Sequence, residues 1–402
     1  MTADIRPGIA AGEVDAPASK SMGHRELICA GLSERSIISG VEFSADMNAT
    51  IGCLRALGAD VACENGKVVL GGLNIKNITN SIEIDCGESG STLRFFIPLC
   101  LVSGKEVRLR GHGRLMQRPQ DVYEKICREQ GLLFENDGSC IHVKGPLKAG
   151  DFRVRGDISS QFISGLMFAL PLLEGDSRIL IEGKLESEPY IEMTIECLKQ
   201  FGVNIERQGG DIFYVKGGQK YGSREFRVEG DYSNAAFLEA LNTVGGSVRV
   251  HNLPTDTLQG DRAYQRIFPE LASGTPEVDI SDCPDLGPVL FAVAAAEHGA
   301  VFTGTRRLRI KESDRVAAMA EELAKFGCII TADDNSVRVP GGGIRTPDEI
   351  LDGHNDHRIV MALSVLCTVT GGSINGAQAV SKSFPDFFDK LRQLGINITE
   401  RN

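Results

Sequence analysis

Residues 199–217 read KQFGVNIERQGGDIFYVKG, and the same phrase returns several times along this chain of 402 residues. It starts as the end of a helix, breaks that helix at a glycine, and continues as two short strands around a polar turn. The other full copies are RALGADVACENGKVVLGG at 55–72, REQGLLFENDGSCIHVKG at 128–145 and AKFGCIITADDNSVRVPGG at 324–342. RQLGINITERN at 392–402 repeats the first half, and ELASGTPEVDI at 270–280 is a weaker copy. The sequence therefore predicts a chain built from repeats of one α/β unit.

A glycine marks the end of the helix in each copy. The six marker glycines are Gly58, Gly131, Gly202, Gly274, Gly327 and Gly395. They follow one another at intervals of 53 to 73 residues, which is longer than the period of common solenoids. Glycine suits this place because helices often end on a residue with left-handed backbone. Asn65-Gly66 and Asp137-Gly138 further predict tight hairpin turns in two copies. We therefore expect six α/β units.

The length of the chain favours two domains, and six units divide into three for each. The last copy stops after one strand, while Asp4–Asp15 has no unit of its own. We therefore expect the N-terminal segment to supply the missing strand to the C-terminal half. This predicts an N-terminal domain at 16–228 and a discontinuous C-terminal domain at 1–15 and 229–402. The chain would cross between them twice, as a two-stranded hinge beside a cleft that holds the active site.

Composition and charge exclude several classes of protein. A net charge of −11 argues against binding to nucleic acid or to an anionic membrane surface. The eleven cysteines form no C-x-x-C pair and indicate free thiols in a reducing compartment, with Cys29 and Cys367 in apolar runs typical of a core. The N-terminus lacks an apolar signal segment, and no apolar run approaches the roughly 18 residues of a membrane span. We expect a soluble, cytoplasmic protein.

Cations recur in glycine-, serine- and proline-rich motifs before the expected helices. KESDR at 311–315 places two cations and two carboxylates where a helix begins, with Ser313 or Asp314 as its N-cap. One such motif alone also fits a solvated surface helix. Eight cations share this setting: Lys20, Arg25, Arg94, Arg118, Lys311, Arg315, Arg358 and Lys382. Two anionic substrates repel by about 4 kcal/mol per charge pair at about 4 Å in protein-like surroundings, and nearby cations offset this repulsion. The set indicates a transferase with two anionic substrates.

Other site types have little support. The sequence contains no G-x-x-x-x-G-K-[ST], and no G-x-G-x-x-G follows a strand and opens a helix. The histidines show no metal-ligand spacing, so we expect no metal site. They include His112, His142, His354 and His357.

Nine motifs occur in one order across residues 17–388: SKSMGHR, CGESGSTLR, QRP, SSQF, SEPY, PD at 284–285, KESDR, NDHR and KSFPDF. In this the chain resembles the 5-enolpyruvylshikimate-3-phosphate synthase family of enolpyruvyl transferases. The resemblance implies an α/β (α+β) fold with two similar domains, each of three βαβαββ units in pseudo-threefold arrangement, an inverse α/β barrel. It implies transfer of the enolpyruvyl group of phosphoenolpyruvate to the 5-hydroxyl of shikimate 3-phosphate, on the route to chorismate and the aromatic amino acids. It implies no cofactor, and we expect a monomer.

The resemblance also implies residue roles. Shikimate 3-phosphate would contact Lys20, Ser21, Arg25, Ser159, Ser160, Gln161, Ser187, Tyr190, Asp285 and Lys311. Phosphoenolpyruvate would contact Lys20, Gly90, Arg118, Gln161, Arg315, Arg358 and Lys382. Asp285 would act as base on the 5-hydroxyl and Glu312 as proton shuttle at the methylene, with Lys20 and Lys311 as cationic partners. Supporting residues would be Glu88, Arg94, Arg307 and His357.

Several positions depart from the common family pattern. Glu88 stands where asparagine is common and Glu188 where lysine is frequent, and each adds negative charge near an anion. Gly90 leaves room for the inhibitor glyphosate, although Phe95 stands where proline is often seen. Two other functions stay open from the residues: a related transferase acting on UDP-N-acetylglucosamine, and a non-catalytic anion-binding module. The first carries a cysteine in the loop before the matching Arg118-Pro119, and GHGRLMQRP has none.

Overall fold

Five of the six sheets have the same four-stranded plan in this computed structural model, which describes residues 1–64, 66–79 and 81–401. Two parallel strands lie at one edge, and the second of them continues into an antiparallel pair. The sixth sheet has only two strands, which are parallel. The expectation of a repeated α/β unit is confirmed, and Asn65 of the expected Asn65-Gly66 turn lies outside the described residues.

The contacts divide the chain into two units. Unit 1 is Met1–Ser19 with Gly230–Asn402, and unit 2 is Lys20–Glu229. Unit 2 contains three sheets, in the strand orders β14 (Glu225–Arg227), β3 (Ser36–Ser39), β5 (Lys67–Gly71), β4 (Asp60–Glu64); β6 (Ile82–Asp85), β7 (Glu106–Arg110), β9 (Cys140–Lys144), β8 (Leu133–Asn136); and β10 (Asp151–Arg155), β11 (Ser177–Glu182), β13 (Ile212–Val215), β12 (Ile205–Gln208). Its helices are α1 (Lys20–Leu32), α2 (Ala45–Ala56), α3 (Gly90–Val102), α4 (Asp121–Gln130), α5 (Ser160–Ala169) and α6 (Glu188–Gln200).

Unit 1 contains the other three sheets. Their strand orders are β15 (Ser247–His251), β2 (Ala11–Asp15); β16 (Glu277–Asp279), β17 (Gly299–Thr303), β19 (Ser336–Pro340), β18 (Thr331–Ala332); and β20 (Leu351–Asp352), β21 (Gly372–Asn375), β1 (Thr2–Ile5), β22 (Ile398–Arg401). The helices are α7 (Tyr232–Thr243), α8 (Tyr264–Ser273), α9 (Gly287–Ala296), α10 (Arg315–Lys325), α11 (His357–Thr370) and α12 (Phe387–Gln393). Short 3₁₀ turns include η4 (Gly260–Ala263), η5 (Pro284–Leu286), η6 (Arg306–Ile310) and η7 (Ala377–Lys382).

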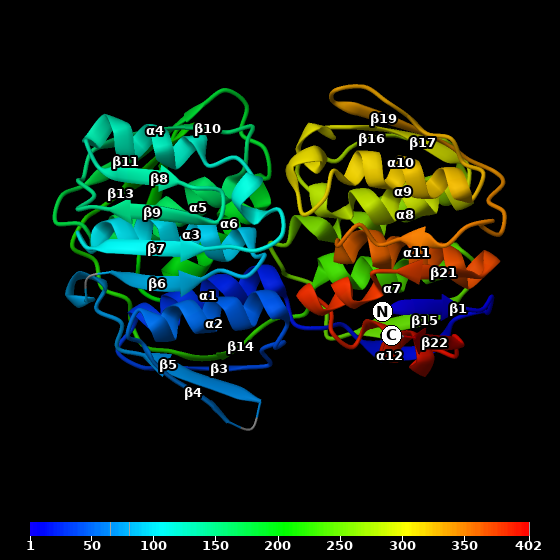
Figure 1. Cartoon of the computed structure of the whole chain (residues 1–402), viewed down its shortest axis with the longest axis horizontal. Coiled ribbons are helices and arrows are strands. Elements are labelled where there is room, and N and C mark those ends of the chain that lie inside the picture. Colours follow the sequence, from blue (N-terminus) through cyan, green and yellow to red (C-terminus); the bar gives the residue numbers. More distant parts are fainter. Residues whose placement is uncertain (65, 80, 402) are drawn as a thin grey trace. The chain divides into compact units, whose positions relative to one another are not determined.

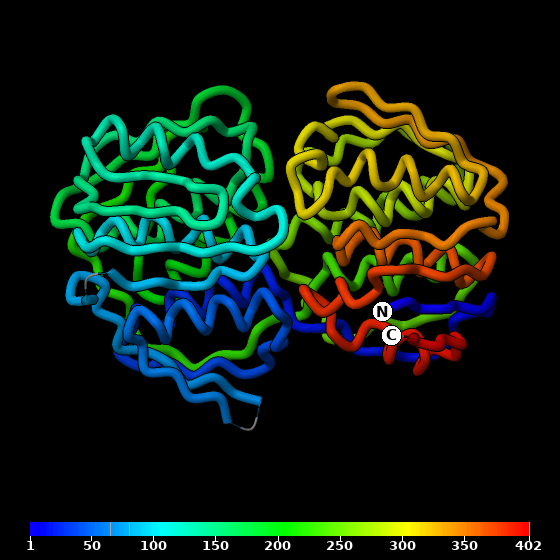
Figure 2. Tube along the Cα trace, in the orientation of Figure 1, coloured from blue at the N-terminus to red at the C-terminus, as the bar shows by residue number. Residues whose placement is uncertain are grey.

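The N-terminal segment completes two sheets of unit 1. Strand β1, blue in Figure 1, lies between β21 and the red β22 and pairs antiparallel with both. Strand β2 pairs parallel with β15. The two ends of the chain therefore lie together in this unit, as the Cα trace shows (Figure 2). The last repeat stops after one strand because its missing partner comes from residues 2–5.

All six marker glycines lie just beyond the last turn of a helix, as expected, and five of them have positive φ. Gly131 is the left-handed C-cap of α4 at φ 69°, and φ is likewise positive at Gly58, Gly202, Gly327 and Gly395. Gly274 instead has φ 176°, which is extended backbone. The weaker copy at 270–280 has no hairpin of its own, because its only strand, β16, pairs with β17 of the next unit. The helix of this copy, α8, therefore ends the unit whose sheet consists of β15 and β2.

Nearly apolar helices form the core of each unit. In α3 every residue except Ser91 is buried, and α3 packs against α5. In unit 1, α9 and α11 are similarly buried and pack against each other. A helix that is apolar all round belongs in an interior, so its first turn is the part that presents polar groups. The candidate site residues lie mainly at these first turns.

Candidate active site

Arg25 organises the first group of candidate residues in unit 2. The residue is 3% exposed, and its guanidinium donates to the Ser21 carbonyl at 2.6 Å and the Tyr190 carbonyl at 2.9 Å. It also donates to the Thr194 hydroxyl at 2.8 Å, which ties α1 to α6. Burial lowers the pKa of Arg25 to about 10, so it stays charged at neutral pH. The structure thus brings together Ser21, Arg25 and Tyr190, as the resemblance implies.

Lys20 is the first residue of α1 and forms an ion pair with Asp46 in the first turn of α2. Nζ of Lys20 lies 2.8 Å from Oδ2 of Asp46, and the two side chains are 16% and 11% exposed. This pairing fixes the ammonium at the helix start. Sequence reasoning missed Asp46, because it lies 26 residues away and belongs to no recognisable motif.

Arg118 covers the start of α3. A Cβ placed on Gly90 would lie 2.5 Å from Nη1 of Arg118 and under 3.0 Å from Cζ and Nη2. Arg118 is 7% exposed and caps the 3₁₀ turn at Leu115–Gln117. Gly90 is therefore required for close approach of the guanidinium rather than for backbone freedom.

Arg94 holds the other residues of this group. Its Nη1 donates to Oε1 of Gln161 at 2.8 Å and its Nη2 to the Pro119 carbonyl at 2.9 Å. Its guanidinium also lies 4.7 Å from the centre of the Phe162 ring. Nε2 of Gln161 donates to the Ser91 hydroxyl at 2.9 Å, so both ends of the amide are fixed. Arg94 thereby connects the starts of α3 and α5 with the segment that carries Arg118.

The three serines assigned to the phosphate lie at two helix starts. Ser159 is the N-cap of α5 and accepts from the backbone N–H of Gln161, and Ser160 is the first residue of that helix. Ser187 occupies the N-cap position of α6 with left-handed backbone, φ 57°, and is 2% exposed. Helix starts with small hydroxyl residues suit oxyanions, because free N–H groups and hydroxyls point outward.

The catalytic candidates of unit 1 converge on Asp285, in the 3₁₀ turn before α9. Its Oδ1 lies 3.1 Å from Nζ of Lys311 and 3.0 Å from Nη1 of Arg315. Its Oδ2 lies 3.1 Å from Nη2 of Arg358, which also donates to the Asp285 carbonyl. Burial alone would raise the pKa of Asp285, but these three cations hold it well below its usual range. Asp285 is therefore ionised at neutral pH.

Arg315 links Asp285 with two further carboxylates. The residue is 1% exposed and donates to Glu312 at 2.7 Å and to Asp356 at 2.9 Å. Asp356 is fully buried, accepts from the Ser313 hydroxyl at 3.0 Å, and caps α11. Burial would lower the pKa of Arg315, but Asp356 and the other acids raise it overall. Asp356 belongs to the NDHR motif, where an acid before a helix is explained by capping alone. The sequence therefore did not predict that Asp356 also pairs with Arg315.

The pKa of Lys311 is lowered, whereas that of the neighbouring cation Arg315 is raised. Burial lowers the pKa of Lys311, although Asp285 opposes the effect. A lysine with a lowered pKa exchanges protons more readily near neutral pH, as an acid–base residue must.

The remaining candidates of unit 1 surround this group. Nζ of Lys382 donates to the Asn355 carbonyl at 2.6 Å, next to Asp356. Arg307 is 5% exposed, donates to the Ser281 carbonyl and acts electrostatically on Lys311. His357 is 1% exposed, with Nδ1 3.9 Å from Oδ1 of Asp356.

Glu188 and Glu88, the two acidic residues that depart from the common family pattern, have different surroundings. Oε1 of Glu188 lies 2.5 Å from Nη1 of Arg207, which also pairs with Glu192. The negative charge of Glu188 is thus compensated at the start of α6. Glu88 lies against Gly113, where an added Cβ would come within 2.5 Å of its Oε2.

One group of side chains in the described residues has the composition of a metal site. Glu321, Glu322 and His354 place ligand atoms within 4.8 Å of one another. Glu322 is fully buried, and its carboxylate already binds Nζ of Lys325 at 2.9 and 3.0 Å and Nε2 of His354 at 3.0 Å. The lysine ammonium thus supplies the positive charge that an ion would bring.

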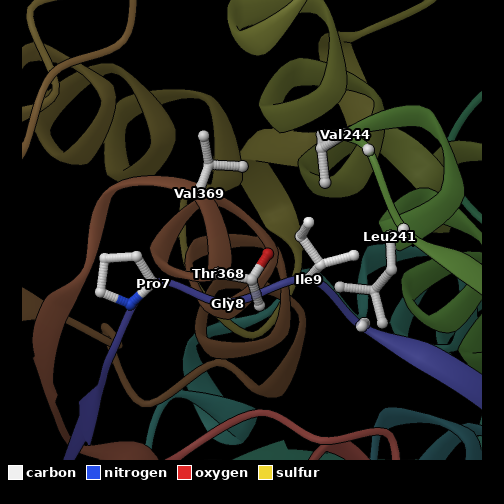
Figure 3. Close-up of a pocket in the computed structure, with 10 residues that line it drawn as sticks. Pro7, Gly8, Ile9, Leu241, Val244, Thr368 and Val369 are labelled. Carbon is white, nitrogen blue, oxygen red and sulfur yellow. The ribbon is translucent and has the colours of Figure 1, made fainter.

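An apolar hollow of about 500 Å³ lies elsewhere in unit 1 (Figure 3). It is lined by Pro7, Gly8, Ile9, Ala10, Leu241, Val244, Gly245, Gly246, Thr368 and Val369. These residues adjoin the C-terminal ends of α7 and α11, whereas Asp356 lies at the N-terminal end of α11. The length of α11 separates them by about 20 Å, so the hollow is not the candidate site.

Comparisons with known proteins identify the family of the chain. The sequence model of the family described as EPSP synthase (3-phosphoshikimate 1-carboxyvinyltransferase) matches residues 6–273 and 265–391. The 3-phosphoshikimate 1-carboxyvinyltransferases of Clostridium novyi and Clostridium acetobutylicum are 39% and 40% identical to the chain, each over 98% of both sequences. A solved EPSP synthase from Acinetobacter baumannii has the same fold, with a TM-score of 0.79 at 20% identity, over 100% of both chains. The expected fold class is confirmed.

No described helix has the length and apolar character needed to cross a membrane. Because the family model matches residues 6–391 and a relative is 39% identical over 98% of the chain, the chain belongs to the EPSP synthase (3-phosphoshikimate 1-carboxyvinyltransferase) family.

Proposed function

We propose that the candidate residues of unit 1 and of unit 2 bind phosphoenolpyruvate and shikimate 3-phosphate. As a member of its family, the chain is an enolpyruvyl transferase of aromatic biosynthesis. The observation that carries the assignment of residues is the position of Asp285 among Lys311, Arg315 and Arg358. A module that only binds anions has no need of a carboxylate at the centre of its cations.

The residues of unit 2 suit the shikimate 3-phosphate. Arg25, with Ser21 and Tyr190 beside it, would hold the carboxylate and flank the ring. Ser159, Ser160 and Ser187 would hold the 3-phosphate with their hydroxyls at the starts of α5 and α6, and Gln161 and Lys20 would complete this set.

Cations from both units suit the phosphoenolpyruvate. Lys20 and Arg118, which packs on Gly90, would contribute from unit 2. Arg315, Arg358 and Lys382 would contribute from unit 1. Their charges compensate the repulsion between two anionic substrates that must come into bonding distance.

The reaction needs two proton transfers during addition and two during elimination. During addition, Asp285 accepts the proton of the 5-hydroxyl while the oxygen bonds to C2 of the phosphoenolpyruvate. Glu312 delivers a proton to the methylene carbon, giving a tetrahedral intermediate. During elimination the new methyl group returns a proton to Glu312, the C2–O bond to phosphate breaks, and the phosphate leaves with the proton that Asp285 accepted from the 5-hydroxyl. Lys20 and Lys311 stabilise the charges that develop.

The related transfer to UDP-N-acetylglucosamine fits less well. The nearest thiol downstream of Arg118 is Cys127, which is fully buried in α4. Burial raises the pKa of Cys127 to about 12, so it is not a reactive thiolate.

Phosphate release distinguishes the candidate functions. We expect release from phosphoenolpyruvate only when shikimate 3-phosphate is present, and none with UDP-N-acetylglucosamine. Absence of release with shikimate 3-phosphate would overturn the proposal. In single-turnover experiments Asp285→Ala should slow the chemical step strongly, and a nearly unchanged rate would remove Asp285 as the base.

We further propose that the enzyme is a cytoplasmic monomer that requires no metal or other cofactor. Eleven free cysteines support a reducing compartment. Sedimentation of the purified protein tests the oligomeric state.

A further inference from the structure

The two places where the chain leaves and re-enters unit 1 lie side by side. Ala18 and Gly230 form an antiparallel bridge, and the Asp231 N–H donates to the Pro17 carbonyl at 2.8 Å. Lys20 follows this first segment directly. The geometry of these two segments therefore bears on where the first residue of α1 is placed.

One side chain of unit 1 bonds both segments. Oε1 of Gln259 accepts from the Tyr232 N–H at 3.0 Å and from the Ser19 hydroxyl at 3.4 Å. Its Nε2 donates to the Gly230 carbonyl at 2.7 Å. Gln259 is 4% exposed and Ser19 1% exposed, so water does not compete for these bonds. Because one partner is a carbonyl and another an N–H, the orientation of the amide is determined.

The same bonds reach a second site residue. Asp231 caps α7 and accepts from the Asn234 N–H at 3.0 Å. Nδ2 of Asn234 donates to the Ser383 carbonyl at 3.4 Å, next to Lys382. Gln259 is thus connected through Ser19 to Lys20, and through the start of α7 to Lys382.

We propose that Gln259 is a positioning residue for enolpyruvyl transfer. It fixes the two connecting segments, and through them Lys20 and Lys382, without touching either substrate. This inference rests on the proposed function, in which both lysines contact phosphoenolpyruvate. Neither the motifs nor the residue roles implied by the family resemblance include Gln259.

The test compares Gln259→Leu with a matched control in the same unit. Asn242 also makes three side-chain hydrogen bonds, to Val248 N and O at 2.6 and 2.8 Å and to Glu239 at 3.0 Å. It lies near the C-terminal end of α7, away from both connecting segments. The measurements are kcat, KM for phosphoenolpyruvate, melting temperature, and the Kd of shikimate 3-phosphate bound alone.

For Gln259→Leu we expect kcat/KM for phosphoenolpyruvate to fall at least tenfold, with the Kd of shikimate 3-phosphate within threefold of wild type. Asn242→Leu should lower the melting temperature comparably and leave kcat/KM within twofold. Gln259→Glu should recover activity toward pH 6, where the neutral acid donates to the Gly230 carbonyl as the amide does, and lose it toward pH 9.

Equal loss of kcat/KM in Gln259→Leu and Asn242→Leu would overturn the inference, as would wild-type kinetics in Gln259→Leu. If Gln259→Leu does not fold, an activity of Gln259→Glu that tracks wild type at every pH would overturn it instead. Each effect is measured relative to the wild-type enzyme. If the proposed function itself is wrong, the wild-type enzyme releases no phosphate, and this outcome differs from every outcome that concerns Gln259.

Discussion

Arg118 lies so close to Gly90 that a single added methyl group would collide with its guanidinium. Gly90→Ala keeps a backbone that α3 accepts, so the displacement falls on Arg118, the flexible partner. We expect KM for phosphoenolpyruvate to rise about tenfold, while the Kd of shikimate 3-phosphate changes less than twofold. Steady-state kinetics and calorimetric binding of shikimate 3-phosphate measure the two effects.

Gly52→Ala is the control for this substitution. Gly52 is exposed within α2 and has no atom within 4 Å of an added Cβ, so alanine should stabilise the helix by up to about 1 kcal/mol without kinetic effect. An unchanged KM for phosphoenolpyruvate in Gly90→Ala would show that Arg118 does not hold this substrate.

The features that the sequence predicted depend on neighbouring residues, and the features that it did not predict are contacts between residues far apart in the chain. The glycine after each helix and the hairpin that follows depend on neighbouring residues, so the repeat was readable. The same applies to cations at helix starts. Asp46 and Asp356 were missed as partners because their contacts with Lys20 and Arg315 join residues 26 and 41 positions apart. The copy at 270–280 is weak because its strand joins the next unit and no hairpin follows its helix.

Asp356→Asn removes a buried charge that holds Arg315. Arg315 keeps Asp285 and Glu312, so the loss of stability should be about 2 kcal/mol, below the roughly 3–5 kcal/mol for a single buried pair. The guanidinium loses its ionised partner at Nε and is held less firmly beside Asp285, so we expect kcat to fall at least tenfold. Urea unfolding and turnover rates measure both effects.

Asp314→Asn is the matched control, because Asp314 caps α10 at the neighbouring position and asparagine caps a helix about equally well. Its kcat and stability should stay near wild type. If Asp356→Asn behaves in the same way, Asp356 does not determine the position of Arg315.

Glu26 makes the stability of the protein depend on pH. Burial raises the pKa of Glu26 from its usual 4.5 to about 8, and Glu229 adds to this. Between these values the folded state keeps a proton that the unfolded state has released. Stability therefore falls as pH rises from about 5 to about 8, by up to about 1.4 kcal/mol per pH unit from this group.

Glu26→Gln removes this titration, so the variant should gain on wild type as pH rises and exceed it above pH 8. Chemical unfolding at pH 5, 7 and 9 measures the difference. Glu34→Gln, at an exposed position just beyond α1, should follow the wild-type pH profile. A Glu26→Gln profile parallel to wild type would show that Glu26 is not a buried neutral acid.

Removal of residues 1–12 should destabilise unit 1 and leave unit 2 folded. The deletion takes away β1, which separates β21 from β22, and the start of β2, which pairs with β15. It also removes the core side chains Ala3 and Ile5, so the apolar side chains that they cover become exposed. Hydrogen exchange followed by mass spectrometry locates the effect, with lost protection expected at 230–401 and native protection at 20–229.

Asp4→Asn keeps the strand and weakens only the contacts with Ser373 and Arg401, so its exchange should stay near wild type. Loss of protection confined to 20–229 would mean that the N-terminal strands support the other unit.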